Sequence, residues 1–320
     1  MKKKFRYIVI VILFFFVIYI LTHSRSVVET MKFSMDLWKN NVFPTLFPFF
    51  IISDLLINYG FVEIASKLFT PLMKFFKIKK ECACIFVLSL FSGFPSNSKY
   101  AKELFDKNII DEYDVTKILL FTHFSNPLFI LGTIGIFLNQ KLAFLILISH
   151  YLGNFIIGII FRNYHPSYSD SNIKIQSNIS NNFIETLTSS LFKTIDTLLL
   201  LLGIISTFLI ITCMISDILN INQNLQYFIN GIIEMTQGIK YICSSNIDIN
   251  LKAIVSTFFI SLGGICIHAQ VKSVLKGVNI KYKIYLLARI LHAFISSTIL
   301  FLLINIWLFC FIQSTSFFFI

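Results

Sequence analysis

Long apolar runs, separated by short segments of charged and amide residues, fill most of this sequence. A helix needs about 20 predominantly apolar residues to cross a bilayer core of about 30 Å. From length and hydropathy the pattern predicts six spans, at residues 7–21, 42–58, 115–138, 141–161, 195–215 and 283–311. The expected fold class is therefore an all-α polytopic membrane protein.

A shorter apolar run, residues 82–91, ends at Gly93-Phe94-Pro95 and gives way to Ser96, Asn97, Ser98 and Lys99. It is too short to cross a bilayer as a helix. Gly and Pro followed by hydroxyl, amide and ammonium groups suit a chain that enters the membrane and turns back, with its irregular backbone buried in protein or lining a wet cavity. The pattern predicts a re-entrant helical hairpin over residues 82–108; a surface loop between two helices is the alternative.

The second half echoes this order of elements. Residues 251–260 lead into the segment Ser261 to Gln270, which is expected to form a second re-entrant hairpin with its turn at Gly263 and Gly264. Amphipathic segments at residues 61–78 and 225–243 precede the two hairpins and are expected to lie in the interface. Placing Gly93 on Gly264 also places Asn126-Pro127 on Ser297-Thr298, but few identities survive, so chance alignment remains an alternative.

The span at residues 115–138 is interrupted by Ser125-Asn126-Pro127. Proline disfavours helical geometry at the preceding residue and so frees backbone carbonyls near the midplane. Two hairpins and broken helices in opposite orientations are the layout of many secondary transporters, whose substrate site lies between them. The expected organisation is an N-terminal span and connector (1–34), a first repeat with its linking span (35–162), a polar linker (163–182) and a second, inverted repeat (183–320).

Composition supports a membrane protein and excludes other classes. Hydrophobic residues make up 56% of the 320 residues and charged residues 13%, and the mean hydropathy is +0.78. The net charge of +11 comes from Lys and Arg between apolar runs, where they act as topology determinants and lipid contacts rather than as a nucleic-acid surface. One inconsistency remains. With the N-terminus on the cytoplasmic side, the predicted spans and hairpins place Lys272, Lys276, Lys281 and Lys283 on the outer side, against the usual bias of Lys and Arg toward the cytoplasm.

Polar residues at the predicted turns and breaks are the candidate site. Cationic residues such as Lys99 and Arg289 favour an anion, as do helix N-termini, which carry partial positive charge, whereas a site made mainly of amide and hydroxyl groups would favour a nucleoside. Each candidate also has a purely structural explanation. In that explanation the Lys99 ammonium reaches the lipid headgroups and Arg289 lies near a helix end. Asn126 then only satisfies the broken backbone, and the histidines hydrogen-bond neighbouring spans. The candidate substrate-binding residues are Ser96, Asn97, Lys99, Ser125, Asn126, His268, Gln270, Arg289 and His292, and the candidate hinge residues are Gly93, Pro95, Pro127, Gly263 and Gly264.

The sequence carries no catalytic motif. It lacks the nucleophile elbow, the zinc-protease helix, the phosphate-binding loop and the dinucleotide fingerprint, and its six Cys are scattered among apolar runs. We therefore expect no enzymatic activity, no cofactor and no metal site. Acidic residues are nearly absent from the predicted spans, so no carboxylate proton relay or sodium site is evident, and facilitated movement down a gradient fits equally well.

Several sequence blocks resemble one known family. They are Leu46-Phe-Pro-Phe-Phe50, Phe91-Ser-Gly-Phe-Pro-Ser96, Phe121-Thr-His-Phe-Ser-Asn-Pro-Leu-Phe129, His150-Tyr-Leu-Gly-Asn154, Ser261-Leu-Gly-Gly264, Ala269-Gln-Val271 and Leu287-Ala-Arg-Ile-Leu-His292. Over roughly residues 35–305 the chain resembles the sporulation integral membrane proteins of the YlbJ type, within the wider group that carries a nucleoside-recognition (gate) domain and is similar in plan to concentrative nucleoside transporters. Ser96-Asn97-Ser98 departs from the small Ala/Gly-rich turn expected there.

The resemblance implies a function in sporulation. It implies a protein of the outer forespore membrane, or of the cell membrane, of a spore-forming bacterium, and transport of dipicolinate during cortex-stage spore maturation. A permease for a nucleoside-like or other small solute and a non-transporting sporulation scaffold are the alternatives. The expected partners are a small anionic substrate and membrane lipid, with a second copy of the chain or other sporulation membrane proteins as further alternatives, and no nucleic acid.

Overall fold

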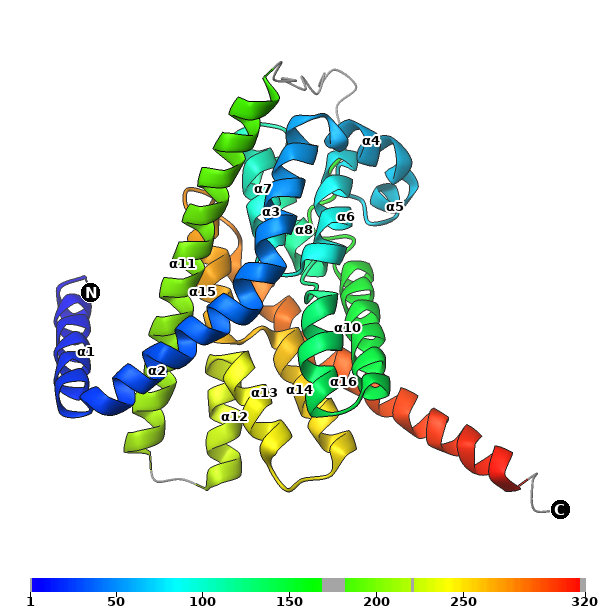
Figure 1. Ribbon diagram of the computed structural model, residues 1–320. Coiled ribbons are helices and arrows are strands. Elements are labelled where there is room, and N and C mark those ends of the chain that lie inside the picture. Colours follow the sequence, from blue (N-terminus) through cyan, green and yellow to red (C-terminus); the bar gives the residue numbers. More distant parts are fainter. Residues whose placement is uncertain (1, 169–181, 220–221, 317–320) are drawn as a thin grey trace.

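The computed structural model describes residues 2–168, 182–219 and 222–316, and this part of the chain contains helices and loops but no strand (Figure 1). Six helical segments are long and apolar enough to cross a membrane. Both observations confirm the predicted all-α polytopic membrane class. The linker predicted at residues 163–182 lies mostly outside the described residues.

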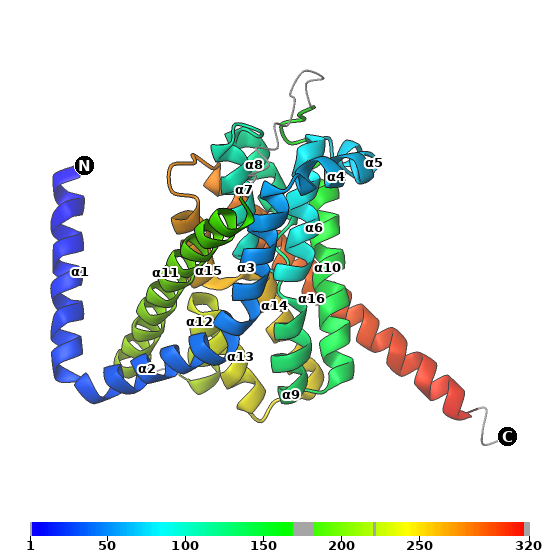
Figure 2. The same cartoon turned by 45° about the horizontal axis from the view of Figure 1, so that its top comes forward.

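The N-terminal helix α1 (Lys2–Thr22) stands beside the bundle, with most of its described side chains exposed (Figures 1 and 2). Near its end, the Tyr19 hydroxyl donates a 2.6 Å hydrogen bond to Asp217 of α11. Helix α2 (Ser24–Leu37) and the short π-helix η1 (Trp38–Val42) then lead into α3 (Phe43–Asn58). Two short amphipathic helices, α4 (Phe61–Leu68) and α5 (Thr70–Phe75), follow at the end of α3, where an interfacial segment was predicted.

Helices α6 (Ala83–Ser92) and α7 (Ser96–Asp106) form an antiparallel pair joined at Gly93-Phe94-Pro95. Each is only about half the length that a bilayer crossing requires. The pair has the geometry predicted for the first hairpin; its depth in a bilayer remains a prediction.

Helix α8 (Glu112–Phe121) ends before a non-helical stretch at residues 122–126. The chain then continues through η3 (Phe129–Ile134) and α9 (Gly135–Phe137), turns, and returns as α10 (Gln140–Ile160). The predicted break at Ser125-Asn126-Pro127 is therefore confirmed.

In the second half, α11 (Phe183–Ile218) begins at Phe183 rather than at residue 195. It is followed by α12 (Gln223–Ile233) and α13 (Met235–Ser244), which pack against each other in antiparallel directions. The Tyr227 and Tyr241 rings stack with their centroids 4.9 Å apart, and a Cβ on Gly238 would lie 2.1 Å from the Gly231 Cα. The predicted interfacial segment at residues 225–243 is thus a tight helical hairpin.

The hairpin predicted over Ser261 to Gln270 is wrong. Helices α14 (Ile249–Leu262) and α15 (Gly264–Val274) form one broken path with a lateral step at Gly263, and together they are long and apolar enough to cross a membrane. The loop after α15 reaches the start of α8, where the Asn279 and Lys281 amides donate to the Glu112 and Thr116 side chains. Positive φ angles at Gly263 and Gly264 redirect the chain without reversing it.

The two halves repeat one order of elements in opposite directions: a long helix (α3, α11), a hairpin (α6–α7, α12–α13), a broken helix (α8–α9, α14–α15) and a return helix (α10, α16, Tyr282–Ser316) (Figures 1 and 2). The tip at Phe94-Pro95 therefore corresponds to Glu234, and the break at residues 122–126 to Gly263. The alignment of Gly93 with Gly264 was out of register because it matched a hairpin tip with a helix break.

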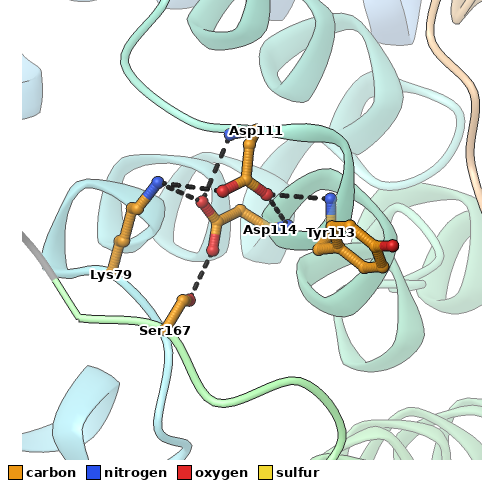
Figure 3. A network of polar contacts seen from close by, with 5 residues as sticks. All are labelled: Lys79, Asp111, Tyr113, Asp114 and Ser167. Atoms are coloured by element: carbon orange, nitrogen blue, oxygen red, sulfur yellow. Dashed lines mark hydrogen bonds and ion pairs between the residues drawn. The ribbon is translucent and has the colours of Figure 1, made fainter.

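Loops 76–82, 107–111, 161–168 and 275–281 lie in the upper half of Figure 1, on the side of the bundle that we call the charged face. Figure 3 shows the contacts that join three of them: Lys79 pairs with Asp111 at 3.2 Å and Asp114 at 2.7 Å, and Ser167 donates to Asp114. Burial opposes the charged form of Lys79, but the two carboxylates outweigh it and raise its pKa.

The broken path α14–α15 brings the loop that carries Lys276 and Lys281 to the start of α8, on the charged face. The Lys281 ammonium lies 5.1 Å from the centroid of the Tyr113 ring at the start of α8. The predicted topology separated loop 275–281 from the loop that carries Lys79, whereas the structure places both loops on the charged face because residues 261–270 do not turn back. A shared face agrees with the bias of Lys and Arg toward one membrane side; which side that is remains a prediction.

Candidate functional site

A cavity of about 410 Å³ lies where the two hairpin tips meet the first helix break. Phe94 and Pro95 reach it from the first tip, and Glu234 and Met235 from the second. The remaining walls come from α2, η1, α3, the α8–α9 break, η3, α9, α11, α13 and α15. The cavity therefore draws its lining from both repeats.

Close backbone contact fixes the first tip. Gly93 has a φ of +73°, and a Cβ there would lie 2.3 Å from the Asn126 backbone nitrogen. The Phe94 amide donates a 2.7 Å hydrogen bond to the Phe124 carbonyl. Because glycine alone adopts this backbone at so short a separation without strain, the tip can sit directly on the break. Gly93 therefore forms the turn of the tip; its role as a hinge remains a prediction.

Asn126 has two functions at the break. Its Oδ1 accepts a 2.8 Å hydrogen bond from the Leu128 amide, which caps the helical segment that starts at Pro127. The same residue lines the cavity, as does Ser125. The Ser125 amide donates a 2.9 Å hydrogen bond to His150 Nε2 on α10, which anchors the break from behind.

The second tip contributes a buried carboxylate. Glu234 lies between α12 and α13, is 2% exposed and lines the cavity. One of its oxygens, Oε2, accepts hydrogen bonds from the Thr236 hydroxyl and, at 2.8 Å, from the Gln237 amide, so it caps α13. It is the only residue with an acidic or basic side chain in the described cavity wall.

Amide and hydroxyl groups supply the rest of the polar lining, and aromatic rings supply flat apolar surface. Helical segments α7, α13 and the one starting at Pro127 begin at or beside the wall, so their N-termini bring partial positive charge. Besides Ser125 and Asn126, the neutral polar residues are Asn40, Asn41, Thr45, Thr133, Thr236 and Gln270, and the aromatic residues are Phe94, Phe129 and Phe137.

A sealed cluster lies behind the break, outside the cavity wall. Arg289 is fully buried and donates to the Leu120 carbonyl at the end of α8, and its guanidinium lies 3.1 Å from His292 Nδ1. His292 Nε2 lies 2.9 Å from the His150 carbonyl. Arg289 and His292 therefore join α16 to α8 and α10. In this structure they are not placed to touch a molecule in the cavity.

Of the other predicted site residues, one lines the cavity and others form hydrogen bonds behind it. Gln270 lines the cavity, whereas His268 bonds the Tyr282 hydroxyl and the Leu262 carbonyl. Asn97 donates to the Thr122 carbonyl at 3.1 Å. These bonds make His268 and Asn97 supports of the two broken helices.

Two predicted residues lie just beyond the first tip, toward the charged face. Ser96 is fully buried, and its hydroxyl has no hydrogen-bond partner. The Lys99 ammonium lies 3.3 Å from the Thr194 hydroxyl and 4.4 Å from the centroid of the Phe50 ring. Neither lines the cavity.

Sequence reasoning missed Glu234, Asn40 and Asn41. The signal for Glu234 is its position between two amphipathic helices that each carry a glycine, Gly231 and Gly238, together with Gln237 three residues later. That spacing is typical of a capped helix start rather than of a continuous interfacial helix.

Comparisons with known proteins agree with this architecture. Residues 40–164 match the Gate family, described as nucleoside recognition. The chain is 27% identical to the sporulation integral membrane protein YlbJ of Bacillus subtilis (strain 168), in an alignment that covers 89% of this chain and 79% of that protein. No solved structure matches the chain significantly.

The fold, the cavity between two hairpin tips and the family match define a multi-pass integral membrane protein with a gate domain. Within that class the chain is similar, over most of its length, to the sporulation integral membrane protein YlbJ.

Proposed function

We propose that this protein is a carrier, not an enzyme, and that it moves a small planar solute across the outer forespore membrane during spore maturation. Dipicolinate is the first candidate substrate. It would bind in the cavity between the hairpin tips, and one repeat would then move against the other to expose it on the opposite side. The similarity to YlbJ supports the sporulation setting.

The observation that carries this proposal is the convergence of both tips and the first helix break on one cavity. Helix N-termini at the wall favour carboxylates without a full cationic charge in the membrane. Phe94 and Phe129 offer apolar surface to a pyridine ring, and Asn40, Asn126 and Gln270 offer amide donors to its carboxylates.

A nucleoside-like solute is the second candidate, and one observation favours it. The described wall contains a single carboxylate and no Lys or Arg, so its side chains present mainly amide and hydroxyl groups. Such a wall suits a neutral molecule with a flat base and hydroxyl groups. The gate family description, nucleoside recognition, points the same way.

Uptake into proteoliposomes tests both candidates. Labelled dipicolinate and a labelled nucleoside are offered in parallel to wild type, Asn126→Ala and Asn139→Ala. Asn139 is the matched control, because it also caps a helix, α10, by accepting a 2.8 Å bond from an amide, but it lies outside the cavity wall. Each lost cap costs about 1 kcal/mol of stability.

We expect saturable dipicolinate uptake that Asn126→Ala lowers at least tenfold and Asn139→Ala leaves near the wild-type rate. Nucleoside uptake alone would replace the first candidate by the second. If folded wild-type protein moves neither solute, or if both substitutions have the same effect, the carrier function at this cavity is wrong.

A further inference from the structure

Glu234 combines three properties that its role as a helix cap does not explain together. It is 2% exposed, it lies at the tip of a hairpin whose arms close tightly at Gly231 and Gly238, and it lines the cavity. An ionisable side chain inside a membrane protein usually faces a cavity and takes part in moving a solute or a proton.

No cation neutralises this carboxylate within the described residues. Its two hydrogen-bond donors, the Thr236 hydroxyl and the Gln237 amide, are both neutral, and no ion pair among the described residues includes Glu234. The titratable group that faces it from a packed element is the Cys266 thiol of α15; no charged side chain of α9, α11, α12 or α13 interacts with it. An ionised carboxylate buried without a cation is costly, whereas its protonated form needs none.

An anion in the same cavity makes that cost larger. Two carboxylates at close range cannot both stay ionised cheaply, and one of them takes up a proton. A bound dicarboxylate therefore favours protonated Glu234, and protonated Glu234 favours the bound dicarboxylate. Such coupling between two ligands is reciprocal by thermodynamic necessity.

We propose that Glu234 is a proton-binding site of the carrier and that it takes up one proton when an anionic carboxylate substrate enters the cavity. The proton leaves again when the substrate is released on the other side. The carrier thus moves a proton together with the anion and lowers the net negative charge that crosses the bilayer. This inference rests on the proposed transport of an anion.

Proton uptake on binding is the direct test. Dipicolinate is titrated into the purified protein in lipid nanodiscs by calorimetry, in two buffers with different ionisation enthalpies, at several pH values. The variants are Glu234→Gln, which keeps the volume and a cap acceptor, and Asp54→Asn. Asp54 is an equally buried carboxylate, 2% exposed and bonded to Ser190, that lies outside the cavity wall.

At pH values where free Glu234 is ionised, we expect wild type and Asp54→Asn to take up about one proton per dipicolinate bound and to bind with an affinity that falls about tenfold per pH unit. Glu234→Gln should bind with no proton uptake and no such pH dependence. A residue that only caps α13 would leave proton uptake unchanged in this variant.

The outcomes separate this inference from the proposed function. If wild type binds dipicolinate without taking up a proton at any of the pH values, or if Glu234→Gln still takes one up, the role of Glu234 is wrong and the anion carrier stands. If folded wild-type protein binds a nucleoside but not dipicolinate, both the proposed anionic substrate and the proposed proton uptake by Glu234 are wrong.

Discussion

At the residue scale, Gly93 shows how closely the first hairpin tip fits the neighbouring break. Its φ of +73° is one that side-chain-bearing residues rarely adopt, and a Cβ would meet the Asn126 backbone at 2.3 Å. Backbone atoms cannot move aside as a flexible side chain would. The whole tip would have to shift away from the cavity wall.

We therefore expect Gly93→Ala to destabilise the protein by about 1–3 kcal/mol and to weaken substrate binding. Gly203→Ala is the control, because Gly203 lies inside helix α11 and nothing lies within 4 Å of its added Cβ. Thermal unfolding in detergent measures both. Equal melting temperatures for the two variants would show that the tip tolerates a side chain.

The candidate residues were predicted best where local chemistry determined their position. Asn126 precedes a proline, and that pair alone predicts a break with a cap. Arg289 was interpreted as a site residue because an intramembrane Arg needs a partner, but the partner is the Leu120 carbonyl. Only the packing of α16 against α8 places that carbonyl within reach.

At the element scale, the network of Figure 3 holds the loop before α6, the start of α8 and the segment after α10 together. Asp111 caps α8 by accepting from the Tyr113 and Asp114 amides. Burial opposes ionisation of Asp111, but these amide bonds and the Lys79 ammonium outweigh it and lower its pKa.

The pH dependence follows from these two directions. The stabilisation from ionised Asp111 is complete above the ordinary Asp pKa of about 4 and is lost as the pH falls through the lowered pKa of Asp111. The stabilisation from charged Lys79 is complete below the ordinary Lys pKa of about 10.4 and is lost as the pH rises through the raised pKa of Lys79. Both are present at neutral pH. Lys79→Gln should therefore speed hydrogen exchange at the start of α8 at neutral pH.

Lys67→Gln is the matched control, because Lys67 pairs with Glu63 of the same helix, α4, and both side chains are exposed. Hydrogen exchange followed by mass spectrometry at residues 111–116 distinguishes the two variants. Unchanged protection in Lys79→Gln would mean that the network does not hold these elements together.

At the scale of the whole molecule, the inverted repeats fix which loops share a membrane side. Loop 275–281 joins the charged face through contacts with Glu112, Thr116 and Tyr113. Loop 245–248 lies at the opposite end of the bundle (Figure 1). In the predicted hairpin, where residues 261–270 turn back, loop 275–281 would instead lie on the same membrane side as loop 245–248.

Cysteine labelling measures the difference. In a variant without native cysteines, Lys74→Cys and Lys276→Cys should react with an impermeant maleimide from the same membrane side, and Asn246→Cys from the other. All three positions are exposed. Labelling of Lys276→Cys together with Asn246→Cys would restore the hairpin and overturn the broken crossing.

The sequence by itself determined the membrane class, the first hairpin, the break at Asn126 and most span positions. Each of these depends on local chemistry: the length of an apolar run, the positive φ that Gly93 permits, and the backbone restriction that Pro127 imposes. The tertiary structure alone decided that Gly263 marks a crossing and that Glu234 marks a hairpin tip. A glycine permits a lateral step as readily as a reversal, and an amphipathic helix suits an interface as well as a buried arm. Contacts between the two repeats, distant in sequence, resolve each ambiguity.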